Sequence, residues 1–247
     1  MRSTTKEDRQ LQKDTNPQDI PFFQVLADYE ILEPEQTDRW NPLLDDVELY
    51  HRLALFREIT LSLRLSAVES LRQKILDVGC GNGRSCRMYL DFGFSPSQIT
   101  GIDIRYDAVS LAKKIHPGIE FLSYSGDQIP FPDNTFTWVS LCTVMSSIRS
   151  QRERGILAKE VARVIAPGGH FFYWDLRWAN AFAGGGLLTP EELFPDFVTI
   201  SSGLVCIYGT IEDILRPGIA QSTLKILARR FCKRPTHCSA LFRKPRV

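Results

Sequence analysis

The amino-acid sequence predicts an α/β protein whose mostly parallel sheet is covered by helices on both faces. Between residues 74 and 176, short apolar segments alternate with amphipathic segments at helical spacing. This alternation is typical of parallel sheets with crossover helices. A glycine-rich loop, GCGNG at residues 79–83, directly follows the first apolar segment. The 247 residues show no internal repeat and no low-complexity linker, so we expect a single domain.

The first 72 residues precede the alternating pattern. Residues 1–20 are polar and aperiodic, which predicts a mobile N-terminal arm. Residues 21–50 interleave aromatic with acidic side chains, and residues 51–72 repeat apolar positions at the spacing of an amphipathic helix. We therefore expect residues 21–72 to form a helical lid or N-terminal extension of a domain that covers residues 21–247.

The remaining elements follow from apolar runs and their breakers. Strands are expected at residues 74–79, 98–104, 119–125, 136–144 and 170–176, and helices at 83–93, 106–116 and 152–166. Further along, Thr189 and Pro190 are typical of the cap and first turn of a short helix. Strands at 197–209 and 238–244 and a helix at 219–231 complete the expected elements.

Composition and charge exclude several classes of protein. The net charge of +1 excludes a globally basic nucleic-acid binder. No apolar run approaches the roughly 18–20 residues of a membrane span, and no apolar signal segment opens the sequence. Six cysteines without a CxxC pair suit reduced thiols, and we expect a cytoplasmic protein. The chain after Asp213 carries basic residues and no acid, so contact with phosphate remains an alternative to a solvated surface.

The glycine loop carries the most specific chemical signal. Gly79 and Gly81 let the backbone turn tightly at the carboxyl end of the first parallel strand, where open α/β sheets bind ligands. Asp103 ends the next strand, and its carboxylate suits the hydroxyls of a ribose. Asp77 precedes the loop, and this anion is unfavourable beside a pyrophosphate but suits a cationic ligand. S-adenosylmethionine is a cationic nucleoside without phosphate, whereas a dehydrogenase would carry GxGxxG instead of GxGxG.

Four segments in order resemble a known family. The segments ILDVGCGNGR, GIDI, IPFPDNTFTWVSLCTV and EVARVIAPGGHFFYWDL resemble the class I (Rossmann-like) S-adenosylmethionine-dependent methyltransferases. Within that family they are similar to methyltransferase type 11, the branch of the ubiquinone and menaquinone methyltransferases. The resemblance implies a three-layer α/β/α sandwich with a seven-stranded, mostly parallel sheet and an antiparallel last strand. It also implies a cofactor-binding core at residues 73–176, with substrate-side loops and last strands at 177–247.

The resemblance implies a role in cofactor binding for eleven residues. The glycine loop would cradle the methionine part, the residues after the second and third strands would bind ribose and adenine, and the end of the fourth strand would lie beside the methyl group. The adenine amino partner stays open between Ser125 and Asp127. The full set is Asp77, Gly79, Cys80, Gly81, Asp103, Ile104, Ser125, Gly126, Asp127, Cys142 and Thr143.

Fewer signals point to the acceptor side. Asp175 ends the fifth strand and is a candidate general base, although pairing with Arg177 or capping of the following turn is an equal alternative. His51 and His237 are further catalytic candidates. Trp40, Tyr50 and Ser146 are candidates for contact with substrate. No carboxylate cluster suits a divalent metal, so none is expected.

These observations together predict an S-adenosylmethionine-dependent methyltransferase. The expected acceptor is a small molecule, methylated by in-line transfer at an oxygen of a secondary metabolite or sugar. One alternative is a nucleic-acid methyltransferase that uses the basic C-terminal tail. A second is an inactive methyltransferase-like binding protein. The sequence makes no prediction of oligomeric state.

Overall fold

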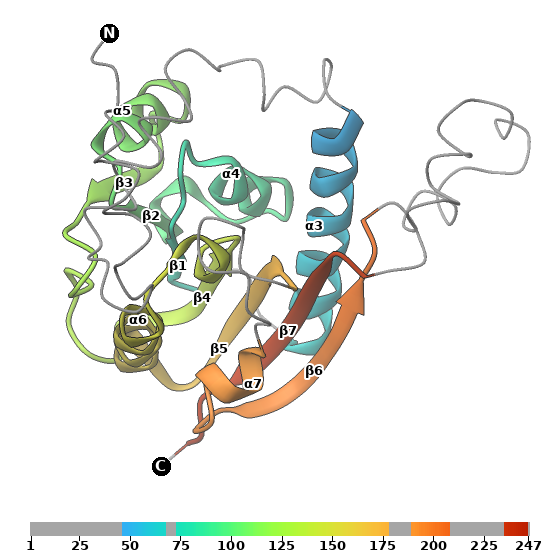
Figure 1. Ribbon diagram of the computed structural model, residues 1–247. Coiled ribbons are helices and arrows are strands. Elements are labelled where there is room, and N and C mark those ends of the chain that lie inside the picture. Colours follow the sequence, from blue (N-terminus) through green and yellow to red (C-terminus); the bar gives the residue numbers. More distant parts are fainter. Residues whose placement is uncertain (1–45, 68–72, 178–188, 208–234, 247) are drawn as a thin grey trace, which may run out of the picture.

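Seven strands form one mixed sheet at the centre of the structure, a computed structural model that describes residues 46–67, 73–177, 189–207 and 235–246 (Figure 1). The strand order is β3-β2-β1-β4-β5-β7-β6. The first five strands pair in parallel, and β7 runs antiparallel to both β5 and β6. The predicted fold class is confirmed, including the antiparallel last strand.

The strands are the apolar runs of the sequence. Three of them, β1, β2 and β7, are buried along nearly their whole length, as expected for strands covered on both faces. The bounds are β1 Ile75–Val78, β2 Ile99–Asp103, β3 Glu120–Ser123, β4 Phe136–Cys142, β5 Ile165–Leu176, β6 Val198–Val205 and β7 His237–Arg243.

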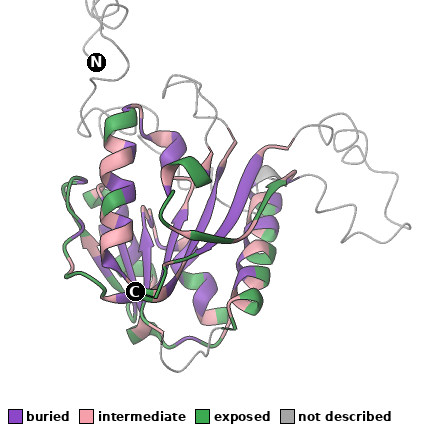
Figure 2. Cartoon of the chain, turned by 90° about the horizontal axis from the view of Figure 1, so that it is seen from below, coloured by how far each residue is buried: buried purple, intermediate pink, exposed green. Residues whose placement is uncertain are grey.

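Helices cover the two faces of the sheet. Residues of α3, α4 and α5 join one apolar cluster, and residues of α6 and the end of α7 join the other, so the two groups lie on opposite faces. Figure 2 shows the buried strands between helices whose outer sides are exposed. The bounds are α3 Asp46–Leu65, α4 Arg84–Asp91, α5 Tyr106–Ile115, α6 Gln151–Val164 and α7 Pro190–Leu193, with 3-10 turns η3 Pro96–Gln98 and η4 Met145–Ser147.

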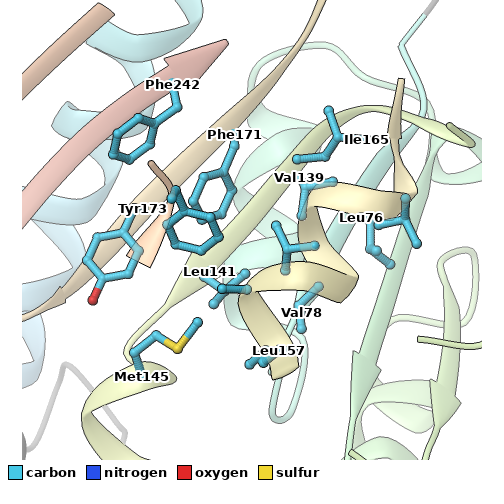
Figure 3. Packing of buried hydrophobic residues seen from close by; sticks show 14 of the residues in the cluster. Leu76, Val78, Val139, Leu141, Met145, Leu157, Ile165, Phe171, Tyr173 and Phe242 are labelled. Atoms are coloured by element: carbon cyan, nitrogen blue, oxygen red, sulfur yellow. The ribbon is translucent and has the colours of Figure 1, made fainter. Parts of the chain in front are cut away.

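Alternation along the central strands divides the core. On β5, Phe171 and Tyr173 join the cluster under α6, whereas Phe172 and Trp174 join the cluster under α3. Figure 3 shows the first cluster, in which Leu141 of β4 also packs. Because side chains of one strand serve both layers, each strand end presents neighbouring residues to opposite faces.

Several element boundaries differ from the prediction, among them the ends of α3 at Leu65 and of β6 at Val205. Helix α3 begins at Asp46 rather than at residue 51, and β5 begins at Ile165 rather than at residue 170. The Pro-Gly-Gly segment is not a turn ahead of the strand, because Gly168 N donates to Lys244 O and Lys244 N donates to Gly169 O. The sheet absorbs the segment as an irregularity in the pairing of β4 with β5.

Several expectations fall outside the described residues. These are the N-terminal arm at 1–20, the aromatic segment up to residue 45 with Trp40, and the helix at 219–231. The division of the chain into arm, lid, core and substrate side stays a prediction. No helix in the described ranges is long and apolar enough to cross a membrane.

Candidate active site

The glycine loop leaves β1 in a conformation that requires glycine. Gly79 has φ +73° and Gly81 has φ +54°, in the left-handed region that other residues avoid. A Cβ atom at Gly79 would lie 2.4 Å from Cγ2 of Val144, so Val144 or the loop would have to shift to admit it. A Cβ atom at Gly81 would meet nothing within 4 Å. Gly79 therefore packs against the protein, whereas the space beside Gly81 is open.

Asp103 joins the end of β2 to this loop. Its Oδ2 accepts a hydrogen bond of 2.7 Å from Gly81 N, and its Oδ1 accepts one of 2.9 Å from Arg105 N. Burial of the side chain raises the pKa of this carboxyl above its usual value. Each carboxylate oxygen has a further lone pair beyond these bonds, which fits a ribose diol. The structure thus brings the first two sequence motifs together as predicted.

Asp77 lies below the loop and is buried. Its Oδ1 accepts a hydrogen bond of 2.6 Å from Ser140 Oγ, and its Oδ2 accepts bonds from Ser85 Oγ and, at 3.4 Å, from Cys86 Sγ. Burial raises the pKa of the carboxyl. Both oxygens therefore tie β1 to β4 and α4, and the predicted contact with a ligand ammonium stays a prediction. Ser85 and Ser140 were missed, although Ser140 is a polar residue in the apolar β4 and pairs in register with Asp77.

The end of β4 lies against the glycine loop. Cys142 pairs with Trp174 of β5, and the next residue, Thr143, has φ +59°. Such a conformation is rare for a β-branched residue and costs about 1–3 kcal/mol. It is held by a hydrogen bond of 2.7 Å from Thr143 N to Trp174 O, and Val144 then fills the space beside Gly79. Burial raises the pKa of the Cys142 thiol, which stays neutral.

The segment after β3 approaches the same site. Tyr124 N donates to Asp103 O at 3.2 Å, so the residues that follow begin beside Asp103. Ser125 Oγ donates to Asp127 Oδ1, and this bond lowers the pKa of the exposed Asp127. The buried Gly126 between them has φ +98°. Both candidates for the adenine partner therefore belong to one hydrogen-bonded turn. Half-buried Ile104 directly follows Asp103.

Asp175 lies on the α6 face of the sheet and is fully buried. Its Oδ2 accepts a hydrogen bond of 3.3 Å from Ser146 N, and its Oδ1 accepts one of 2.7 Å from Leu176 N. Burial raises the pKa of the carboxyl to about 6. Asp175 thus contacts the following residue and the η4 turn, and its role as a general base stays a prediction. Ser146 is itself buried, so its contact with substrate stays a prediction.

His51 and His237, the two histidines proposed from the sequence, meet on Trp174 on the other face of the sheet. Trp174 Nε1 donates to His51 Nε2 at 3.1 Å, and the Trp174 and His237 rings stack with centroids 4.7 Å apart. The two imidazole centroids are 5.2 Å apart. Burial lowers the pKa of His51 to about 4 and that of His237 to about 3, so both rings are neutral at pH 7. The sequence carries no signal for this linking role of Trp174, which lies in an apolar strand.

A buried carboxylate ties α3 to the glycine loop. Glu48 accepts hydrogen bonds from Arg52 Nε at 2.7 Å and from Arg84 Nη1. Arg84 is the first residue of α4 and directly follows the glycine loop. Tyr50, on the same turn of α3, is buried. The sequence carries no signal for this pairing, because its partners lie 36 positions apart.

The residues present fit a nucleoside ligand. The open space at Gly81 is a cradle that a side chain would fill, and the Asp103 carboxylate adjoins it. In the described part of the chain, no three His, Cys, Asp or Glu side chains gather in a way that would hold a metal ion.

The chain is similar in sequence to known methyltransferases. Residues 76–173 match the family model described as a methyltransferase domain. A fatty-acid O-methyltransferase of Mycolicibacterium smegmatis is 31% identical over 164 residues, which cover 63% of this chain and 53% of that protein. A phthiotriol/phenolphthiotriol dimycocerosates methyltransferase of Mycobacterium tuberculosis is 34% identical over 139 residues, covering 56% and 46%. The chain thus spans about half the length of the curated relatives it matches.

Solved structures match the fold more widely. A putative sarcosine dimethylglycine methyltransferase from Galdieria sulphuraria superposes with a TM-score of 0.57 at 18% identity, covering 78% of this chain and 86% of that one. An S-adenosylmethionine-dependent methyltransferase from Mesorhizobium loti gives 0.56 at 17% identity, covering 76% and 98%. Residues 76–173 therefore match a methyltransferase domain model, and the chain shares its Rossmann-like α/β fold with these two solved structures.

Proposed function

We propose that this protein transfers the methyl group of S-adenosylmethionine to an oxygen of a small molecule. The observation that carries the proposal is the hydrogen bond from Gly81 N to the Asp103 carboxylate, which holds an acid suited to a diol against an open glycine loop. Bound S-adenosylmethionine supplies an electrophilic methyl group. The residues at the ends of β1, β2 and β4 would hold it, and the strained Thr143 marks the end of β4.

The acceptor is proposed to be lipid-like. Two curated relatives carry names that refer to fatty acids and to phthiotriol dimycocerosates. These names favour an acceptor with a long apolar body over the sugar or other secondary metabolite that the sequence alone favoured. Transfer to oxygen is supported by the name of the first relative.

Two alternatives have less support. A nucleic-acid methyltransferase would use the basic tail, but Lys244 Nζ donates to Ala162 O and Ile165 O at 2.9 and 2.7 Å, which is a structural role. An inactive binding protein would not need the loop geometry at Gly79 and Asp103. We keep the cytoplasmic location and the absence of a metal as expectations.

Isothermal titration with S-adenosylhomocysteine tests the donor site. We expect wild-type protein to bind and Asp103→Asn to bind about 10- to 100-fold more weakly, because one charge-assisted hydrogen bond contributes roughly 1.5–3 kcal/mol. Asp107→Asn is the matched control, because Asp107 is an exposed carboxylate on the first turn of α5. Wild-type protein that does not bind would overturn the proposal, and equal affinity of the two variants would contradict the role of Asp103.

A further inference from the structure

Transfer to a neutral hydroxyl benefits from a base that removes its proton. Asp175, the candidate at the end of β5, is 0% exposed and lies on the α6 face of the sheet. Its oxygens already accept hydrogen bonds from Ser146 N and Leu176 N. Asp175 therefore stabilises the η4 turn and has no exposed oxygen with which to reach an acceptor.

His51 has its proton fixed by a neighbour. An indole N–H is a donor only, so the bond from Trp174 Nε1 requires a lone pair on His51 Nε2. A neutral imidazole with this lone pair on Nε2 carries its proton on Nδ1. The nitrogen of His51 that is not used by Trp174 is therefore a hydrogen-bond donor, the opposite of a base.

Helix α3, which carries His51, contacts both the glycine-loop side and the β4–β5 side of the candidate site. One turn earlier on α3, Glu48 binds Arg84 at the end of the glycine loop. On its other side, His51 binds Trp174, which pairs with Cys142 at the end of β4. Helix α3 thus reaches the residue after the glycine loop through Glu48 and the strand neighbour of Cys142 through His51.

His237 offers no better base. It is 3% exposed, its ring stacks on Trp174, and its Nδ1 lies 2.9 Å from Thr236 Oγ1. Buried in this way, the ring gains a proton with difficulty. The three candidates in the described part of the chain therefore supply one hydrogen-bond donor and no accessible base.

We propose that the acceptor's nucleophile is a carboxylate, ionised before it binds, and that His51 positions it by donating from Nδ1. This inference rests on the proposed methyl transfer. A carboxylate oxygen uses its own electron pair to form the new O–C bond, while the S–C bond breaks and its electron pair remains on sulfur. The products are a methyl ester and a neutral thioether, and no proton is released. A hydroxyl acceptor would release one proton for each methyl transferred.

Binding measurements test the role of His51 without turnover. Dodecanoate and 1-dodecanol are titrated into protein saturated with S-adenosylhomocysteine. We expect His51→Phe to weaken dodecanoate at least about tenfold and to leave dodecanol unchanged, because only the anion gains a charge-assisted bond. His51→Gln keeps an acceptor for Trp174 and a donor for the ligand, so it should retain most of the affinity. His170→Phe, at the opposite end of the β4–β5 pairing, is the control. Equal loss for both ligands, or no loss in His51→Phe, would overturn the inference.

Two further readouts separate this inference from the proposed function. In protein labelled with ¹⁵N-histidine, the resonance lost in His51→Phe should belong to the Nδ1–H tautomer, and an Nε2–H or charged ring would overturn the inference. In a weakly buffered assay, dodecanoate should yield S-adenosylhomocysteine without proton release. If S-adenosylhomocysteine binds but dodecanoate is not methylated, or dodecanol is preferred, the carboxylate is wrong and the donor site stands. If S-adenosylhomocysteine does not bind, the proposed function itself fails.

Discussion

Substitution of the two loop glycines by alanine should separate stability from cofactor binding. Gly79 and Gly81 both have positive φ, so an alanine at either position pays about 1–2 kcal/mol for the left-handed conformation. Their surroundings differ, because a Cβ atom at Gly79 lies 2.4 Å from Val144 Cγ2 whereas one at Gly81 meets nothing within 4 Å.

The expected losses follow from this difference. Gly79→Ala adds an overpacking cost of about 1–3 kcal/mol to the backbone cost, for a total of roughly 2–5 kcal/mol. Gly81→Ala pays the backbone cost alone. In a domain of this size, 1 kcal/mol shifts the melting temperature by about 2–4 °C. Gly79→Ala should therefore melt clearly below Gly81→Ala.

Gly81→Ala should weaken cofactor binding strongly although it costs less stability than Gly79→Ala. Its alanine methyl group would occupy the open space that we assign to the ligand, so titration with S-adenosylhomocysteine should reveal a large loss in a protein that is still folded. Thermal melting by circular dichroism and calorimetric titration measure both quantities on the same samples. If Gly81→Ala binds like wild type, the open space at Gly81 is not the cofactor cradle. If both variants melt together, Val144 yields and the packing argument fails.

Three further predictions concern buried groups. Tyr89→Phe should lower the free energy of unfolding by about 1–3 kcal/mol, because Tyr89 Oη accepts a hydrogen bond of 2.8 Å from the buried Trp138 Nε1. Tyr173→Phe should be neutral or stabilising, because in the described structure Tyr173 Oη is buried without a partner. Urea unfolding of the pair checks this, and an equal loss would refute it. The pKa of His237 is lowered to about 3. The neutral His237 ring therefore contributes its full stability above pH 6.5, and this contribution decreases as the pH falls below 6.5. Wild type should therefore lose about 2 kcal/mol more than His237→Phe between pH 7 and pH 5, as measured by urea unfolding at both pH values. Lys244→Met should lower the melting temperature, because it leaves the carbonyls of Ala162 and Ile165 without this donor. An unchanged melting temperature would show that Lys244 does not stabilise the fold.

The sequence predicted most of the fold because its signals are local. Apolar runs and their glycine and proline breakers placed the strands within a few residues of their observed bounds. The errors occur where a distant partner decides the structure. Gly168 and Gly169 indicate a turn locally, but pairing with Lys244 draws them into β5. Helix α3 begins early, and its Glu48 binds the distant Arg84 as well as the local Arg52, a pairing that no local pattern indicates.

The site was predictable in position but not in orientation. Asp103 and the glycine loop were expected at adjacent strand ends, and the structure joins them by a hydrogen bond. The sequence placed Asp175 at a strand end as well, but the face it occupies depends on the pleat of β5, which puts Trp174 and Asp175 on opposite sides. The hydrogen bond between Trp174 and His51 could not be predicted, because an aromatic residue in an apolar strand has the sequence pattern of a core residue.

Strand order explains why the proposed site lies where it does. The order β3-β2-β1-β4 means that the chain leaves β1 toward α4 on one face and leaves β4 toward α6 on the other. Open α/β sheets bind ligands where neighbouring connections diverge in this way. Gly79 and Val144 meet at this point, so the loops after β1 and β4 are in contact at their bases. Asp175, on the α6 face, binds the η4 turn. His51, on the α4 face, lies on the same side of the sheet as Asp77 and Trp174. Topology therefore decides on which face of the sheet each polar residue at a strand end lies, and its hydrogen bonds decide whether it supports the fold, as those of Asp77 do.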